Sequence, residues 1–158
     1  MPGAWLALAH AAQRAGKLQE AAIAADKAVA LAPRDQAVLR GAAVIFVNLA
    51  NRIRAAQLEE KIAAVNPQER DALPRAVSFY LDANAPDKAA EVAARAQKDD
   101  VRPAVLALYA KALSAANRNE EAEKVWRNVI ERDPYDETYW VDYAQSLLRQ
   151  QKFDEALA

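Results

Sequence analysis

The sequence predicts an all-α protein, an α-solenoid of stacked antiparallel helix pairs. Three observations carry this prediction. Of the 158 residues, 53% are apolar, 27% are charged and only three are glycine, which suits a helical chain. Apolar residues recur at spacings of three and four, the periodicity of amphipathic helices. A pattern about 34 residues long repeats along the chain, and a repeat of that length fits a pair of helices.

The repeat appears as columns of equivalent residues. Pro33, Pro67 and Pro134 are separated by 34 and 67 residues. Bulky apolar residues recur at intervals of 34, 34, 33 and 34 residues, and alanine recurs in the same register: Trp5, Leu39, Leu73, Leu106 and Trp140; Ala21, Ala55, Ala89, Ala122 and Ala156. These columns predict one domain over residues 1–158 with repeats at about 2–35, 36–69, 70–102, 103–136 and 137–158, the last one truncated.

Each repeat is expected to contain two helices, as the first one illustrates. Residues about 4–15 form the first helix, and Gly16 can adopt the positive φ that ends it. The second helix covers 17–32, and Pro33 ends it because proline lacks a backbone donor and disfavours helical geometry at the residue before it. Pro134 marks a later junction, where Asp136 is expected to cap helix 136–150. Trp5, Trp126 and Trp140 are assigned to core columns.

These columns resemble the tetratricopeptide repeat, a helix-turn-helix unit with Trp, Leu, Gly or Ala, Tyr, Ala, Phe and Pro at set positions. The first repeat matches through Trp5, Leu8, Ala9, Gly16, Ala21, Ala28 and Pro33, and the fourth through Leu106, Tyr109, Ala110, Leu113, Ala122, Trp126, Val129 and Pro134. The second and third repeats are degenerate, because Glu59 and Pro86 stand where aromatics are usual. The resemblance implies a right-handed superhelix that acts as a non-catalytic scaffold for protein–protein interaction.

The resemblance also implies a partner-binding groove, because in this family the first helix of each pair lines the concave surface. The register assigns to it Leu6, His10, Arg14, Lys17, Arg40, Val44, Asn48, Asn51, Lys111, Arg118, Gln145, Arg149 and Lys152. Leu81, Val141 and Leu148 add aliphatic contacts, and Asp71 and Asp82 add the acidic ones. Seven basic residues against two acidic ones favour a protein or peptide partner that is acidic. Helix ends also attract cations, which leaves a purely structural explanation open.

The groove is not expected to work as a chaperone-tail receptor. In chaperone-binding members of the family, Lys and Asn clamp a terminal carboxylate, whereas Leu6 and His10 occupy the first of those positions here. Binding is expected to weaken with salt and with charge reversal at Arg14 or Lys111.

Enzyme, metal and cofactor functions find no support in the sequence. There is no cysteine, His10 is the only histidine, and three serines and one threonine lie in no catalytic motif. No glycine-rich phosphate loop is present. A net charge of −1 and a pI near 5.9 do not favour nucleic acid. No apolar run reaches the roughly 20 residues that cross a bilayer, so no membrane insertion of this fragment is expected.

Two other roles stay open. Long arrays of such repeats serve as structural scaffolds or spacers in bacterial envelope assemblies for polysaccharide export, and the alanine and arginine content favours a bacterial source. Terminal helices with exposed apolar faces could instead drive self-association. Because Trp5 already occupies a core column and the last six residues begin a helix that they cannot finish, we expect a fragment of a longer protein. Cytoplasm and periplasm are both compatible with the sequence.

Overall fold

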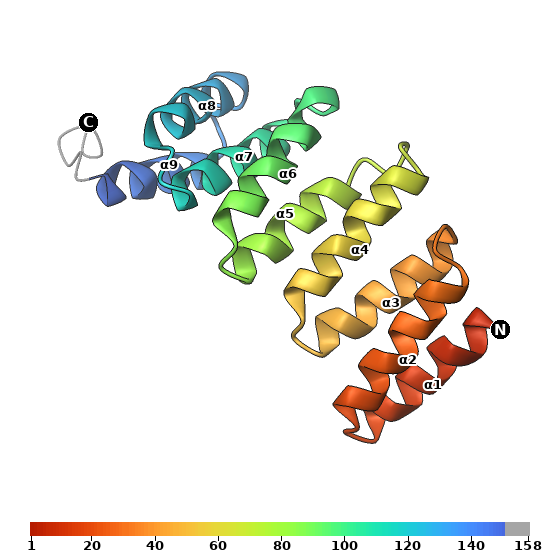
Figure 1. The fold of residues 1–158 in the computed structure, drawn as a ribbon. Helices are drawn as coiled ribbons and strands as arrows, with labels where there is room; N and C mark the ends of the chain where they lie inside the picture. Colours follow the sequence, from red (N-terminus) through yellow and green to blue (C-terminus); the bar gives the residue numbers. More distant parts are fainter. Residues whose placement is uncertain (151–158) are drawn as a thin grey trace. The chain divides into compact units, whose positions relative to one another are not determined.

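A computed structural model describes residues 1–150, and every regular element in that range is an α-helix (Figure 1). In chain order the helices are α1 Pro2–Arg14, α2 Leu18–Leu31, α3 Gln36–Asn48, α4 Arg52–Val65, α5 Ala72–Asp82, α6 Pro86–Asp99, α7 Pro103–Ala115, α8 Asn119–Arg132 and α9 Glu137–Arg149. The predicted all-α fold is confirmed. The two helices expected at about 4–15 and 17–32 are α1 and α2.

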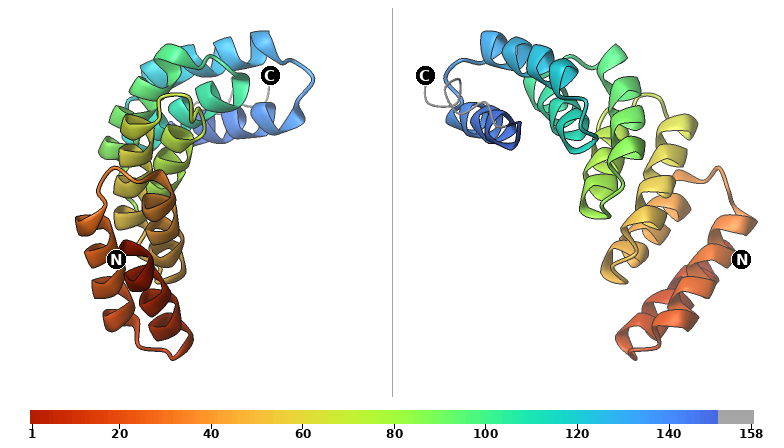
Figure 2. Two further views of the ribbon diagram at one scale, coloured as in Figure 1. Left: turned by 90° about the vertical axis from the view of Figure 1, so that its right-hand side faces the viewer. Right: turned by 60° about the vertical axis from the view of Figure 1, so that its left-hand side comes forward.

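The contacts divide the chain into two compact units, Met1–Ala83 and Asn84–Ala158. In unit 1, α1 packs on α2 and α3 on α4, while α2 contacts α3 and α4 contacts α5. In unit 2, α6 packs on α7, α7 on α8 and α8 on α9, and α7 also touches α9 (Figure 2). Each unit is therefore built from antiparallel neighbours that follow one another in the sequence.

The turn inside each helix pair has one conformation throughout. Gly16, Ala50, Asn84 and Asn117 all have positive φ, between 55° and 74°. In the first turn, Gly16 N donates to Gln13 O and Lys17 N to Ala12 O, at 3.0 and 2.9 Å. This pair of bonds is the Schellman arrangement, which satisfies carbonyls left free at a helix end. The expected role of Gly16 as a helix terminator is confirmed.

Aspartate caps begin the helices that follow two of the prolines. Asp35 Oδ1 accepts from Ala37 N at 2.9 Å, and Asp136 Oδ1 accepts from Thr138 N at 2.9 Å. A carboxylate at this position satisfies backbone donors that have no partner within the helix. The predicted cap at Asp136 is therefore correct, and Pro33 lies two residues beyond the last residue of α2, as expected.

Small and bulky residues alternate in the core of each unit. The buried cluster of unit 1 comprises Ala9, Ala24, Ala25, Val29, Leu39, Ala42, Ala43, Ile45, Phe46, Ala55, Leu58, Ile62 and Ala72. The alanines let neighbouring helices approach closely, and the larger side chains fill the space beside them. In unit 2, Trp126 is 1% exposed and stacks on Tyr143 with ring centroids 6.4 Å apart.

The assignment of all three tryptophans to the core was wrong for Trp140. Its side chain is 50% exposed, and its Nε1 donates to Pro134 O at 3.0 Å. Among residues 1–150, α9 contacts only α7 and α8, so the Trp140 face of the helix has less to pack against. Trp5 is partly buried and lies under the Lys27 ammonium, with Nζ 4.5 Å from the ring centroid.

Candidate functional site

The candidate site in unit 1 is a pocket of about 300 Å³ that we call the α3–α5 pocket. Its lining residues come from three helices: Arg40, Ala43, Val44 and Val47 from α3, Glu59 from α4, and Arg75 and Phe79 from α5. Arg40, Val44 and Val47 share one face of α3 because they are four and three residues apart. Val44 is 49% exposed, so this face is open to a partner.

A buried carboxylate lies within the pocket lining. Glu59 is only 5% exposed, and its Oε2 lies 3.0 Å from Arg75 Nη2. This contact is an ion pair by distance, but no donor in the described part of the chain is aligned for a hydrogen bond to that oxygen. Burial acts to lower the pKa of Arg75, and contact with Glu59 and Glu69 outweighs it, so the pKa lies above its ordinary value. Arg75 is therefore a permanent positive charge at the pocket.

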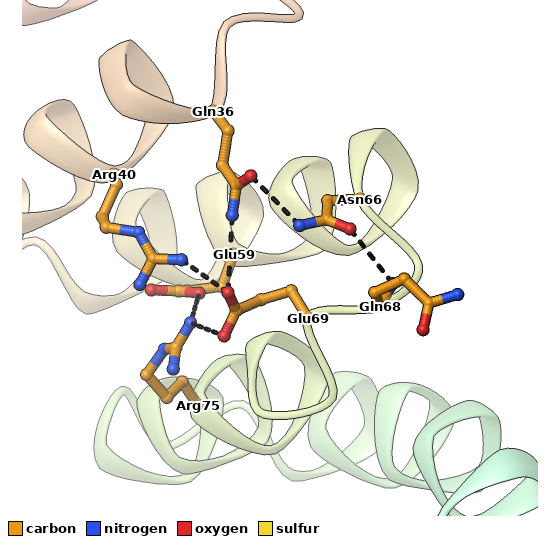
Figure 3. A network of polar contacts seen from close by, with 7 residues as sticks. All are labelled: Gln36, Arg40, Glu59, Asn66, Gln68, Glu69 and Arg75. Carbon is orange, nitrogen blue, oxygen red and sulfur yellow. Dashed lines mark hydrogen bonds and ion pairs between the residues drawn. The ribbon is translucent and has the colours of Figure 1, made fainter.

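A second carboxylate joins the two arginines at the edge of the pocket (Figure 3). Glu69, in the loop between α4 and α5, places Oε2 2.7 Å from Arg40 Nη2 and Oε1 3.5 Å from Arg75 Nη2. Gln36 Nε2 donates to the same Oε2 at 3.4 Å, and Asn66 Nδ2 donates to Gln36 Oε1 at 3.1 Å. No Cα atom of α3 lies within 8 Å of one in α5. Side chains therefore bridge these two helices in place of direct backbone packing.

The α1 part of the predicted groove lies beside α3 in the same unit. Leu6 is partly buried against Gly41, where a Cβ would lie 3.1 Å from Leu6 Cδ1. His10 and Arg14 are exposed on α1. The helix α1 contacts α3 directly, so the two helices are neighbours in unit 1.

Most of the predicted basic row is already paired with carboxylates of the same chain. Of the six basic residues of the row that the structure describes, four form ion pairs: Lys17 with Glu20 at 3.2 Å, Arg40 with Glu69 at 2.7 Å, Lys111 with Asp142 at 2.6 Å and Arg118 with Glu121 at 2.7 Å. The hydrogen bond from Arg118 is the main reason that the pKa of Glu121 is lowered. The row is therefore less positive than its composition indicates.

The two asparagines of the predicted groove, Asn48 and Asn51, differ in their surroundings. Asn48 is exposed at the end of α3. Asn51 is the N-cap of α4, where its Oδ1 accepts from Arg54 N at 3.1 Å. The side chain of Asn51 thus has a structural role in beginning a helix.

In unit 2 the predicted residues lie on α7 and α9. Lys111 reaches Asp142 across the two helices, and Ser114 Oγ lies 2.8 Å from Ser146 Oγ. Gln145 and Arg149 are exposed on α9. A charge reversal at Lys111 would place a carboxylate beside Asp142, so its effect on binding would be mixed with an effect on stability. Lys152 lies outside the described residues.

Glu59, Glu69, Arg75 and Phe79 belong to the site but were not predicted. Glu59 did attract notice as a charge in a column where an aromatic is usual. Its partner Arg75 lies 16 residues further along the chain, on a different helix. A buried charge needs a counter-charge. Burial of Glu59 would therefore predict a basic partner, but it would not identify Arg75 as that partner.

No metal or membrane signal appears in the described range. Residues 1–150 contain no cluster of three or more His, Asp or Glu that could hold a metal ion. No helix in that range is long and apolar enough to cross a bilayer.

This chain matches known protein families and solved structures. Family models described as tetratricopeptide repeat match residues 2–35 and 103–146. No curated protein sequence matches with significance. Many solved structures share the fold, among them YrrB, described as a TPR protein with an unusual peptide-binding site, at TM-score 0.68 and 18% identity over 97% of this chain and 79% of that one.

Two bacterial structures show the same likeness. MamA residues 41 to the end from Desulfovibrio magneticus RS-1 has a TM-score of 0.69 and 16% identity over 99% of this chain and 89% of that one. TTC0263, a thermophilic TPR protein of Thermus thermophilus, has a TM-score of 0.59 and 21% identity over 94% and 82%. These findings show that the chain has an all-α fold and carries tetratricopeptide repeats at residues 2–35 and 103–146, which indicate a module for protein–protein interaction in general.

Proposed function

We propose that this chain binds a peptide or protein segment along the first helices of unit 1, with the α3–α5 pocket receiving a side chain of that partner. The fold is typically a non-catalytic scaffold, so binding is the function to be explained. The observation that supports the site is the pocket itself, a cavity of about 300 Å³ lined by four apolar and three charged residues. Pockets of this kind suit an aliphatic anchor with polar groups that fix its orientation.

An acidic segment fits this surface best. Arg40 lines the pocket, and Arg14 lies exposed on the neighbouring helix α1. A segment with carboxylates beside aliphatic residues would meet basic and apolar groups together. Charged contacts at an exposed surface are screened by salt, so the affinity is expected to fall as ionic strength rises.

Peptides selected from a random display library against this protein provide the test. We expect Val44→Glu to weaken a selected peptide at least tenfold, because it places a charge on the apolar wall of the pocket. The matched control is Ile53→Glu on α4, since Ile53 is 46% exposed and Val44 is 49% exposed. Fluorescence anisotropy measures both affinities. Equal affinity in the two variants would count against the pocket as the site.

Self-association is a second candidate, favoured by apolar exposure on α9. Trp140 is 50%, Val141 54% and Leu148 45% exposed, and all three belong to this helix. Exposed apolar groups close together are typical of interaction surfaces.

A further inference from the structure

We propose that Arg40 and Arg75 form a carboxylate-binding site that the chain's own Glu69 occupies, and that an acidic side chain of the partner replaces Glu69 there. This inference rests on the proposed function, because it assigns a chemical class to a second partner side chain, one that binds at the edge of the α3–α5 pocket beside the aliphatic anchor. It makes Glu69 an internal competitor of the partner.

The geometry around Glu69 is that of a bound carboxylate. Each carboxylate oxygen faces a different guanidinium, Oε2 facing Arg40 at 2.7 Å and Oε1 facing Arg75 at 3.5 Å. Gln36 adds a third donor to Oε2 at 3.4 Å. Charged donors that converge on both oxygens bind carboxylates more strongly and more specifically than a single contact does.

Glu69 is held in a way that allows exchange. It lies in the loop between α4 and α5, where its backbone N donates to Asn66 O at 3.0 Å. Its side chain is 23% exposed and that of Arg40 is 45% exposed. Water screens ion pairs that are partly exposed and weakens them. Rotation of the Glu69 side chain into solvent would open the site, and the partner's carboxylate would then replace the contacts that Glu69 gives up.

Charge balance selects an anion for the vacated site. With Glu69 in place, Arg40, Arg75, Glu59 and Glu69 sum to zero. With Glu69 turned away, the remaining three carry a charge of +1, which an incoming carboxylate neutralises and an incoming ammonium doubles. Val44, Val47 and Phe79 line the same pocket, so an acidic side chain flanked by an aliphatic one matches both chemistries.

A small probe tests the site without knowledge of the partner. Wild type and Glu69→Gln are titrated with N-acetylglutamate amide at constant ionic strength, and the Nε–H resonances of Arg40 and Arg75 are followed by NMR. We expect Glu69→Gln to bind this probe at least fivefold more tightly than wild type. N-acetylglutamine amide, which is uncharged, is expected to shift neither resonance. The matched control is Glu91→Gln, which removes one carboxylate from the exposed pair with Lys88 and is expected to behave as wild type.

Further variants keep the result decisive. Adding Arg40→Gln to Glu69→Gln is expected to abolish the gain, whereas Arg132→Gln on α8 makes the same charge change and is expected to leave it. If Glu69→Gln fails to fold, Glu69→Asp retains the charge but withdraws it from Arg40, and a smaller gain is expected. No gain in the folded variant, or no shift of either arginine resonance, would overturn the proposal.

The two proposals fail separately. If Val44→Glu weakens the selected peptides but Glu69→Gln does not change the affinity for the probe, the carboxylate site is wrong and the proposed function still holds. If Glu69→Gln binds the probe more tightly but Val44→Glu does not weaken the peptides, the carboxylate site holds and the proposed peptide site is wrong.

Discussion

Glu59 and Arg75 show how one residue pair shapes a site. Glu59 is 5% exposed, and its neighbour Arg75 has a side chain that is 34% exposed. A carboxylate removed from water is expensive unless a counter-charge is close. The pair therefore contributes little net stability, but the removal of one member leaves the other buried without compensation.

A double-mutant cycle tests this at the residue scale. We expect Arg75→Met to lower the free energy of unfolding by about 2 kcal/mol, less than for a fully buried pair, because Arg75 is partly solvated. The double variant with Glu59→Met is expected to recover most of that loss, since two apolar side chains replace two charges. Urea unfolding measures both. Additive losses in the double variant would show that the charges do not depend on each other.

At the scale of the helix and its turn, one position has the same left-handed conformation in each of the four helix pairs formed by α1 to α8. Glycine or asparagine occupies it in three turns, but Ala50 occupies it between α3 and α4, with φ 58°. A Cβ in this conformation meets the following carbonyl, at a cost of about 1–2 kcal/mol. The turn between α3 and α4 is therefore strained, although its hydrogen bonds match those of the first turn: Ala50 N to Val47 O at 3.0 Å and Asn51 N to Phe46 O at 2.8 Å.

Relief of this strain is measurable. We expect Ala50→Gly to raise the free energy of unfolding by about 0.5–1 kcal/mol, the strain released less the entropy that glycine adds to the unfolded chain. Ala7→Gly in the middle of α1 makes the same chemical change in a helix, and it is expected to lower stability by about 1 kcal/mol. Thermal and urea unfolding provide the comparison. A loss of stability in both variants would mean that Ala50 is not strained.

At the scale of the whole molecule, association depends on which apolar side chains stay exposed. Trp140 is half exposed although its column is a core column. Val141 and Leu148, which were predicted to line the groove, are exposed on the same helix. A net charge of −1 supplies little repulsion between copies of the chain.

Sedimentation velocity over a concentration series tests association through α9. We expect the wild-type sedimentation coefficient to rise with concentration, and Trp140→Ser to remove that rise by deleting the largest exposed apolar group of α9. Leu31→Ser on α2 is the control, since Leu31 is 57% exposed and its loss should leave the rise unchanged. Loss of the concentration dependence in both variants would indicate nonspecific hydrophobic association rather than association through α9.

Local signals account for the parts of the fold that were predicted correctly. Gly16, Pro33 and Asp136 act within a few residues of their own position, through φ preference, a missing donor and a side-chain cap. Trp126 itself was also correctly placed in the core. The Trp140 error arose because burial depends on what packs against a helix, and a repeat register describes only the helix itself.

The sequence alone determined the helix pairs, their turns and their order, because each of these depends on contacts between residues close in the chain. Tertiary structure decided how the charges combine. Arg40, Glu59, Glu69 and Arg75 come from three helices and a loop, and only folding brings their side chains within ion-pair distance. The same step paired Lys111 with Asp142. Coulomb energy depends on distance in space and on burial, and neither can be read from spacing along the chain.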